Sequence, residues 1–181
     1  MLDLACGRGG GLAFLAEHFG IAKAVGVDFC PRSITFANDT FKDFSACPLT
    51  FIQGDIEYLP QCMPNQNFDL ILSVESWHAL PFPRSTLKQA KDMLSDSDSP
   101  RLIIADGFLN SMLAELENDF KLYFEIEQQI DISYNVRSAR HLGAERMDKI
   151  FEHANQNRDL FKWTSRYCQS MLPGEFMSSP I

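Results

Sequence analysis

The feature that most constrains the fold is a regular alternation of short apolar segments with longer segments of helical periodicity along most of the chain. Short segments rich in aliphatic and β-branched residues predict strands, whereas apolar residues spaced three or four apart predict helices. A chain that alternates between the two forms a parallel sheet covered by helices. We therefore expect an α/β fold with a doubly wound, mostly parallel, Rossmann-like sheet.

The expected elements follow one another without a linker that would separate two domains. Strands are predicted for residues 1–5, 24–28, 49–54, 68–74, 101–106 and 124–132. Helices are predicted for residues 11–19, 31–44 and 84–94, and a further helix has the apolar stripe Leu113, Leu116, Phe120 and Phe124. We expect residues 1–132 to form the α/β core and residues 133–181 to form a helical cap segment of the same domain.

The charge balance excludes one broad class of partner. The chain carries 24 acidic and 16 basic side chains, which give a formal net charge of −8, and its pI is about 4.9. Binding of a nucleic acid depends on Lys and Arg side chains that displace counterions from phosphates, so we expect no nucleic-acid partner. No apolar run approaches the roughly 20 residues that a membrane-spanning helix needs, and we expect no membrane span.

The cysteines argue against a metal centre. The chain has five of them: Cys6, Cys30, Cys47, Cys62 and Cys168. None forms a C-x-x-C pair or accompanies the paired histidines that are typical of a zinc site, so we expect no bound metal. The odd count and the lack of a recognisable signal peptide predict a cytoplasmic protein with free thiols.

A glycine-rich turn, residues 2–11 (LDLACGRGGG), joins the first predicted strand to the first predicted helix. Glycines let the backbone approach a ligand closely, next to the N–H groups of a helix N-terminus. Asp28 ends the second predicted strand nineteen residues after Gly9, where a nucleotide cofactor needs a carboxylate for its ribose hydroxyls. A dinucleotide motif would also require Gly or Ala at the position of Leu12, which disfavours an NAD-dependent dehydrogenase.

These residues resemble motif I of the class I S-adenosylmethionine-dependent methyltransferases, with Ala5 in place of the first of three alternate glycines. The resemblance extends to about residue 132 and implies S-adenosyl-L-methionine as the cofactor. It implies that Asp28 binds the ribose, that Phe29 lies against the adenine, and that Asp55 meets the adenine amino group. The cofactor-binding set implied in this way is Asp3, Ala5, Cys6, Gly7, Gly9, Asp28, Phe29, Asp55, Ile56 and Ser73.

The fourth predicted strand is followed by Glu75-Ser-Trp-His78, which is similar to the Glu-x-x-His stretch of family members that methylate lipids, phenolic metabolites and other small acceptors. The resemblance implies a small-molecule acceptor, with O-methylation favoured. His78 is the candidate general base because histidine titrates near neutral pH, and packing is its alternative role. Glu75 is the second catalytic candidate, as a cofactor ligand, a partner of His78 or a helix cap. Trp77 either lines the acceptor pocket or lies in the core.

Two hypotheses about function remain open at this stage. The chain starts inside the first strand, so we expect it to lack the lid helices usual in the family, and also its seventh strand, while residues 133–181 help to form the acceptor side. It is then either an active methyltransferase or a catalytically silent methyltransferase-like binding module or truncated gene product. Apolar surface exposed by the missing elements leads us to expect a homodimer.

Overall fold

The computed structural model describes residues 1–143, without the side chains of residues 140–142. The chain divides into two units, Met1–Ile126 and Glu127–Ile181. In the second unit, helix α6 spans Ser133–Leu142. No helix among the described residues is long and apolar enough to cross a membrane. The predicted boundary at residue 132, between a core and a cap segment of one domain, stays a prediction.

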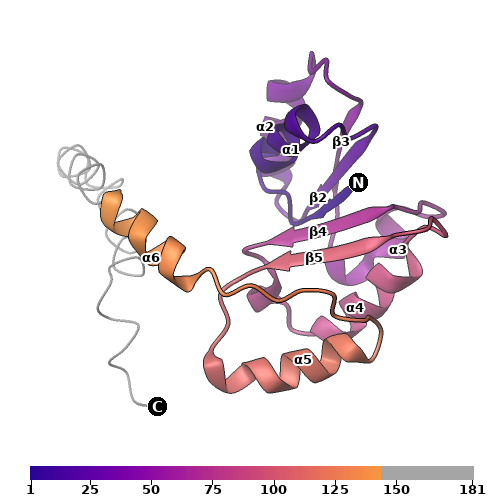
Figure 1. Ribbon diagram of the computed structural model, residues 1–181. Helices are drawn as coiled ribbons and strands as arrows, with labels where there is room; N and C mark the ends of the chain where they lie inside the picture. Colours follow the sequence, from indigo (N-terminus) through magenta and orange to yellow (C-terminus); the bar gives the residue numbers. More distant parts are fainter. Residues whose placement is uncertain (144–181) are drawn as a thin grey trace. The chain divides into compact units, whose positions relative to one another are not determined.

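The first unit is built around one parallel sheet (Figure 1). Its strands are β1 Leu2–Leu4, β2 Ala24–Asp28, β3 Leu49–Gln53, β4 Leu70–Val74 and β5 Arg101–Ala105. They lie in the order β3-β2-β1-β4-β5, and every neighbouring pair is parallel. The chain runs outward from β1 to β3 and then crosses to β4, so the order reverses between β1 and β4. Ligands of open α/β sheets bind at the carboxyl ends of the strands beside such a reversal.

Helices cover both faces of the sheet, as the doubly wound prediction requires (Figure 1). Helices α1 (Gly10–His18) and α2 (Pro31–Phe41) pack on one face around the buried side chains Leu12, Ala16, Ile34, Ala37 and Phe51. Helices α3 (Leu59–Cys62) and α4 (Pro83–Asp92) bury the other face, together with α5 (Leu113–Lys121) and the short 3-10 helices Ile56–Tyr58 and Trp77–Ala79. A third 3-10 helix, Asn110–Met112, precedes α5 and has no buried residue. The predicted fold class is therefore confirmed.

The alternation of side chains along the strands explains the two cores. Leu2 and Leu4 on β1 are fully buried in the core that contains α3 and α4. Asp3 points to the opposite side of the pleat and is also buried, with 7% of its surface exposed. Burying an ionised carboxylate in the central strand costs free energy unless a partner compensates its charge. Asp3 therefore marks the carboxyl end of β1 as a place where a ligand could act.

The strand predicted for residues 124–132 is wrong, because the structure has no strand there. The N–H of Phe124 donates to the carbonyl of Phe120 at 2.9 Å, which continues the end of α5. Ile130 and Ile132 are 66% and 46% exposed. A strand in a sheet needs a neighbouring strand to pair with and an apolar face that is covered. Residues 124–132 have neither. Among residues 1–143 the sheet has five strands and no antiparallel one.

Candidate active site

The glycine loop between β1 and α1 has a backbone that few residues other than glycine adopt. The φ angles of Gly7 and Gly9 are +55° and +80°, and Ala5 shares this left-handed region at +59°. A Cβ atom added to Gly9 would lie 2.5 Å from the ring of Phe51, whereas one added to Gly7 would meet no atom within 4 Å. Gly9 therefore lets the loop pack against β3, and Gly7 borders open space.

Asp28 connects the end of β2 to this loop. Its Oδ2 accepts a hydrogen bond from the Gly7 N–H at 2.8 Å, and its Oδ1 accepts one from the Cys30 N–H at 2.8 Å. Each carboxylate oxygen can accept more than one hydrogen bond. Asp28 can therefore fix the loop and still accept hydrogen bonds from hydroxyl groups of a ligand.

Asp3 and Asp28 make the space beneath the loop acidic. Burial, and to a smaller extent the charge of Asp28, raise the pKa of Asp3 to about 7. Burial together with both carboxylates raises the pKa of the Cys6 thiol to about 12, and a Cβ on Gly26 would lie 2.7 Å from the Cys6 sulfur. Cys6 is therefore a packed, neutral thiol, and a cation beside Asp3 would relieve the repulsion between the two carboxylates.

The other residues predicted to bind the cofactor differ in their exposure and in the hydrogen bonds that they already make within the protein. The Phe29 side chain is 77% exposed at the end of β2 and is free to cover a planar ligand. Asp55 caps the short helix after β3 by accepting the Glu57 N–H at 2.9 Å. Ile56 is buried in the core. The hydroxyl of the fully buried Ser73 lies 2.7 Å from that of Ser76, so this hydroxyl is already engaged within the protein.

His78 lies beyond the end of β4 and is paired with a residue that the sequence reasoning did not select. Its Nδ1 is 2.7 Å from Oδ1 of Asp106, and its backbone N–H donates to Oδ2 of the same carboxylate at 3.0 Å. The Asp106 side chain is 1% exposed and that of His78 is 51% exposed. The available signal for Asp106 was its place at the end of a predicted strand, the same place that singled out Asp28.

Glu75 and Trp77 lie between β4 and His78. Glu75 is exposed and has a φ of +53°, and its N–H donates to the carbonyl of Ala105 at 2.8 Å. Ligand atoms of Glu75, His78 and Asp106 lie within 4.8 Å of one another, close enough to hold a metal ion, and the expected absence of a metal stays a prediction. Trp77 is 2% exposed and belongs to the core, so the alternative that it lines a pocket is wrong.

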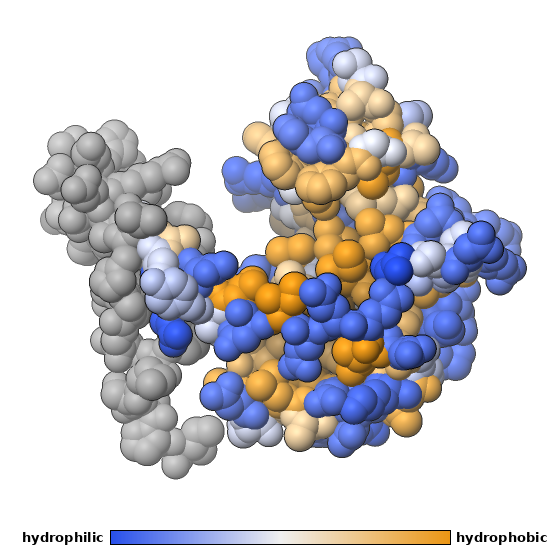
Figure 2. Space-filling view, viewed as in Figure 1, coloured by the Kyte–Doolittle hydropathy of each residue, from blue (hydrophilic) through white to orange (hydrophobic). Residues whose placement is uncertain are grey.

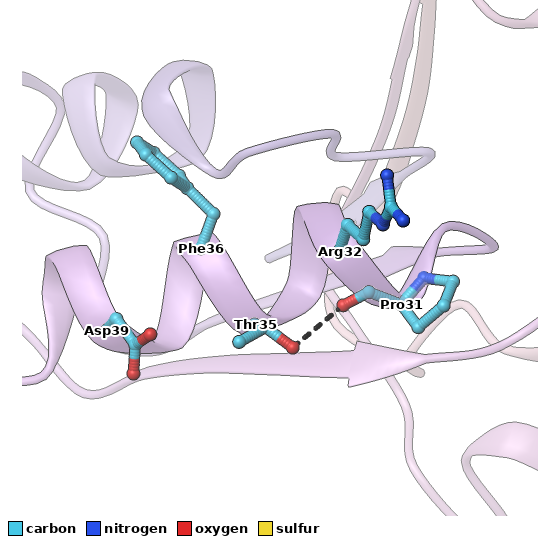
Figure 3. Close-up of a pocket in the computed structure, with 5 residues that line it drawn as sticks. All are labelled: Pro31, Arg32, Thr35, Phe36 and Asp39. Carbon is cyan, nitrogen blue, oxygen red and sulfur yellow. Dashed lines mark hydrogen bonds between the residues drawn. The ribbon is translucent and has the colours of Figure 1, made fainter.

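The surface also has hollows away from these residues. One of about 400 Å³ runs along α2 and is lined by Pro31, Arg32, Thr35, Phe36 and Asp39. Figure 3 shows the hydroxyl of Thr35 bonded back to the carbonyl of Pro31, at 3.0 Å. None of the predicted site residues lines it. The candidate site is instead the end of the sheet where the glycine loop, Asp28 and His78 follow β1, β2 and β4.

The chain is similar to proteins that are named as methyltransferases of lipids. Fatty-acid O-methyltransferase of Mycolicibacterium smegmatis is 38% identical over 81 residues, which are 45% of this chain and 28% of that protein. Phthiotriol/phenolphthiotriol dimycocerosates methyltransferase of Mycobacterium leprae is 27% identical over 161 residues, which are 88% of this chain and 53% of that protein. The chain thus spans at most about half the length of these two relatives.

The fold is shared with solved methyltransferases, and a family model covers most of the chain. The structure of phosphoethanolamine N-methyltransferase 2 from Haemonchus contortus matches 94% of this chain and 44% of that one, with a TM-score of 0.76 and 17% identity. At that identity the match concerns the fold alone. The family model for the methyltransferase domain matches residues 1–159. This chain therefore belongs to the methyltransferase domain family, and its fold is that of the class I S-adenosylmethionine-dependent methyltransferases.

Proposed function

We propose that the chain binds S-adenosyl-L-methionine and methylates an oxygen atom of a small molecule, such as a lipid, a phenol or another metabolite. The observation that carries this proposal is that one end of the sheet holds both parts such a reaction needs. The glycine loop and Asp28 follow β1 and β2, and the His78–Asp106 pair follows β4 and β5. Since β1 pairs with β4, the two parts are neighbours across the strand-order reversal.

The charges near β1 fit the cofactor. S-adenosyl-L-methionine carries a positively charged sulfonium and an ammonium group, and when bound it supplies the methyl group that an oxygen nucleophile takes. The two acidic side chains beneath the loop, Asp3 and Asp28, repel each other when both are ionised. A cationic ligand removes that repulsion, whereas the phosphates of a dinucleotide would increase it. Asp28 would hold the ribose hydroxyls, and Phe29 would cover the adenine.

The residues after β4 favour a hydroxyl acceptor. A hydroxyl group must lose its proton as its oxygen is methylated, and a positioned base accelerates such a step by roughly 10²- to 10⁴-fold. His78 is held by a carboxylate and half-exposed to solvent, which suits a group that takes up a proton and then returns it to water. The rest of the rate acceleration would come from holding the two reactants in line, which can supply about 7–11 kcal/mol.

The names of the relatives agree with methylation on oxygen. One is a fatty-acid O-methyltransferase, and another is a malonyl-[acyl-carrier protein] O-methyltransferase from Paenibacillus, 23% identical and covered over 60% of its length. Both named acceptors are acyl compounds that are methylated on oxygen. We therefore expect an acceptor with an acyl or aryl body and an oxygen nucleophile.

The test is a methyl-transfer assay with two kinds of acceptor, detecting the methylated product by mass spectrometry. His78→Gln should lower turnover of alcohols and phenols by about 10²-fold or more. A fatty acid already lacks its proton at neutral pH, so its methylation should be far less affected. His18→Gln, at the exposed end of α1, is the matched control. Cofactor binding without turnover of any acceptor would instead indicate a silent binding module.

We also propose that the chain forms a homodimer, because apolar side chains on the edge strand β5 and on its neighbour β4 are exposed. Val74 on β4 and Ile103 on β5 are 47% and 46% exposed. Figure 2 shows apolar surface in the middle of the first unit, where Figure 1 draws these strands. Static light scattering of the wild type and of Ile103→Lys tests this. A monomeric wild type at micromolar concentration would exclude the dimer.

A further inference from the structure

We propose that Asp106 is a positioning residue that fixes the tautomer of His78 and so makes Nε2 the nitrogen that takes the proton of the acceptor. The inference rests on the proposed function for its role in the reaction. Its structural part, control of the imidazole tautomer by one buried carboxylate, stands without it. Asp106 lies 28 residues after His78 in the sequence.

The carboxylate of Asp106 contacts three N–H positions, two on His78 and one on Gly107. Oδ2 accepts the backbone N–H of His78 at 3.0 Å. Oδ1 accepts the backbone N–H of Gly107 at 2.7 Å and also lies 2.7 Å from Nδ1 of His78. Backbone N–H groups can only donate, and an ionised carboxylate can only accept. The short contact to Nδ1 is therefore satisfied when Nδ1 carries the hydrogen.

The position of that hydrogen decides the chemistry of the ring. A neutral imidazole with its hydrogen on Nδ1 has its lone pair on Nε2. When an acceptor O–H bond breaks, its electron pair stays on the oxygen that is being methylated and its proton forms a bond to Nε2. The resulting imidazolium carries a positive charge next to the buried Asp106 carboxylate, which stabilises it. Nε2 can then release the proton to solvent, since the His78 side chain is 51% exposed.

Backbone pairing and a buried side chain hold both partners in place. β4 and β5 are paired in register as far as Val74 and Ala105, and the N–H of Glu75 continues the ladder to the carbonyl of Ala105. The chain then turns sharply at Glu75, where φ is +53°. The buried side chain of Trp77 anchors the short helix that presents His78. Preorganised support of this kind is what a catalytic base requires.

Asp106→Ala is the variant that tests the inference, because it removes both carboxylate oxygens. An amide at this position would not decide the question, since its oxygen could face the Gly107 N–H and Nδ1 together and keep the hydrogen on Nδ1. With no acceptor facing Nδ1, the ring should adopt the Nε2–H form, which is the major tautomer of a free neutral histidine side chain. Asp98→Ala, at an exposed position in the turn before β5, removes one negative charge elsewhere and serves as the matched control.

The first readout is the tautomer itself, measured on the whole chain by ¹H–¹⁵N correlation spectra of the imidazole rings, with His78→Gln to assign the signal. We expect Nδ1–H in the wild type and in Asp98→Ala, and mainly Nε2–H in Asp106→Ala. A wild-type ring with its hydrogen on Nε2, or an unchanged tautomer in Asp106→Ala, would overturn the inference. This readout requires no activity, so it separates failure of the inference from failure of the proposed function.

The second readout is turnover of a hydroxyl acceptor. Asp106→Ala should lower kcat by about 10²-fold or more, within the range for losing a general base, and should leave the KM of the acceptor nearly unchanged. It should have no further effect when combined with His78→Gln, because both variants remove the same function. An additive loss in the double variant would overturn the positioning role. So would turnover that EDTA abolishes and Mg²⁺ restores, since Glu75, His78 and Asp106 would then be metal ligands.

Discussion

Replacing Asp3 by Asn should make the protein more stable above neutral pH, although the substitution lies in the centre of the sheet. The reason is that the folded chain raises the pKa of Asp3 from about 4 to about 7, mainly by burial. The folded state therefore holds a proton between pH 4 and pH 7 that the unfolded state has lost. The stability from this group is present below pH 4 and is lost as the pH rises through 7.

The expected magnitude follows from the size of that shift. Three pKa units correspond to about 4 kcal/mol at 1.36 kcal/mol per unit. Asn has the shape of the protonated acid and does not ionise. The free energies of unfolding of the wild type and Asp3→Asn should thus be similar at pH 4, and the variant should be more stable at pH 8 by up to about 4 kcal/mol.

Urea unfolding followed by circular dichroism at pH 4, 6 and 8 measures this difference. Asp39→Asn, on the exposed side of α2, is the control and should show no comparable gain. The reasoning would be refuted if Asp3→Asn were destabilised equally at every pH. It would also be refuted if the difference between variant and wild type grew toward low pH, because the sign of the linkage would then be reversed.

Three further predictions follow from the loop and its neighbours. Asp28→Asn should weaken S-adenosyl-L-methionine binding about 10- to 100-fold by calorimetry, the value of a hydrogen bond to a charged group, and unchanged affinity would remove the ribose assignment. Gly9→Ala should lower the free energy of unfolding by about 2 kcal/mol or more, because its Cβ would overlap Phe51 at a positive φ; an unaltered urea midpoint would argue against this. Iodoacetamide at pH 8 should alkylate Cys30 faster than Cys6, since hydrogen bonds from Ser33 lower the pKa of the Cys30 thiol and burial raises that of Cys6. Equal rates by peptide mass spectrometry would contradict it.

Local patterns in the sequence were sufficient to predict the sheet, because each strand of a buried parallel sheet is a short apolar run between turns. β2, β4 and the start of α2 were located within a residue or two. The same reasoning failed at residues 124–132, where Ile130 and Ile132 alternate with polar residues but remain exposed. Alternation alone does not supply the neighbouring strand that a β conformation needs.

The candidate site was only partly predictable, for a related reason. Asp28 lies at a fixed interval from the glycine loop, so the sequence alone predicts both. Asp106 acts through His78, and the two residues meet only because β5 lies beside β4 in the sheet. Local sequence patterns do not predict which strands are neighbours. Trp77 is apolar and adjacent to His78, and only its burial decides between pocket and core.

The most direct test of the account is a calorimetric titration of the 181-residue chain with S-adenosyl-L-methionine and, separately, with NAD. Micromolar binding of S-adenosyl-L-methionine alone is the predicted result, with release of a fraction of a proton near pH 7 because a cation beside Asp3 favours its ionised form. The absence of S-adenosyl-L-methionine binding by a demonstrably folded sample, or preferential binding of NAD, would contradict the assignment of the cofactor site.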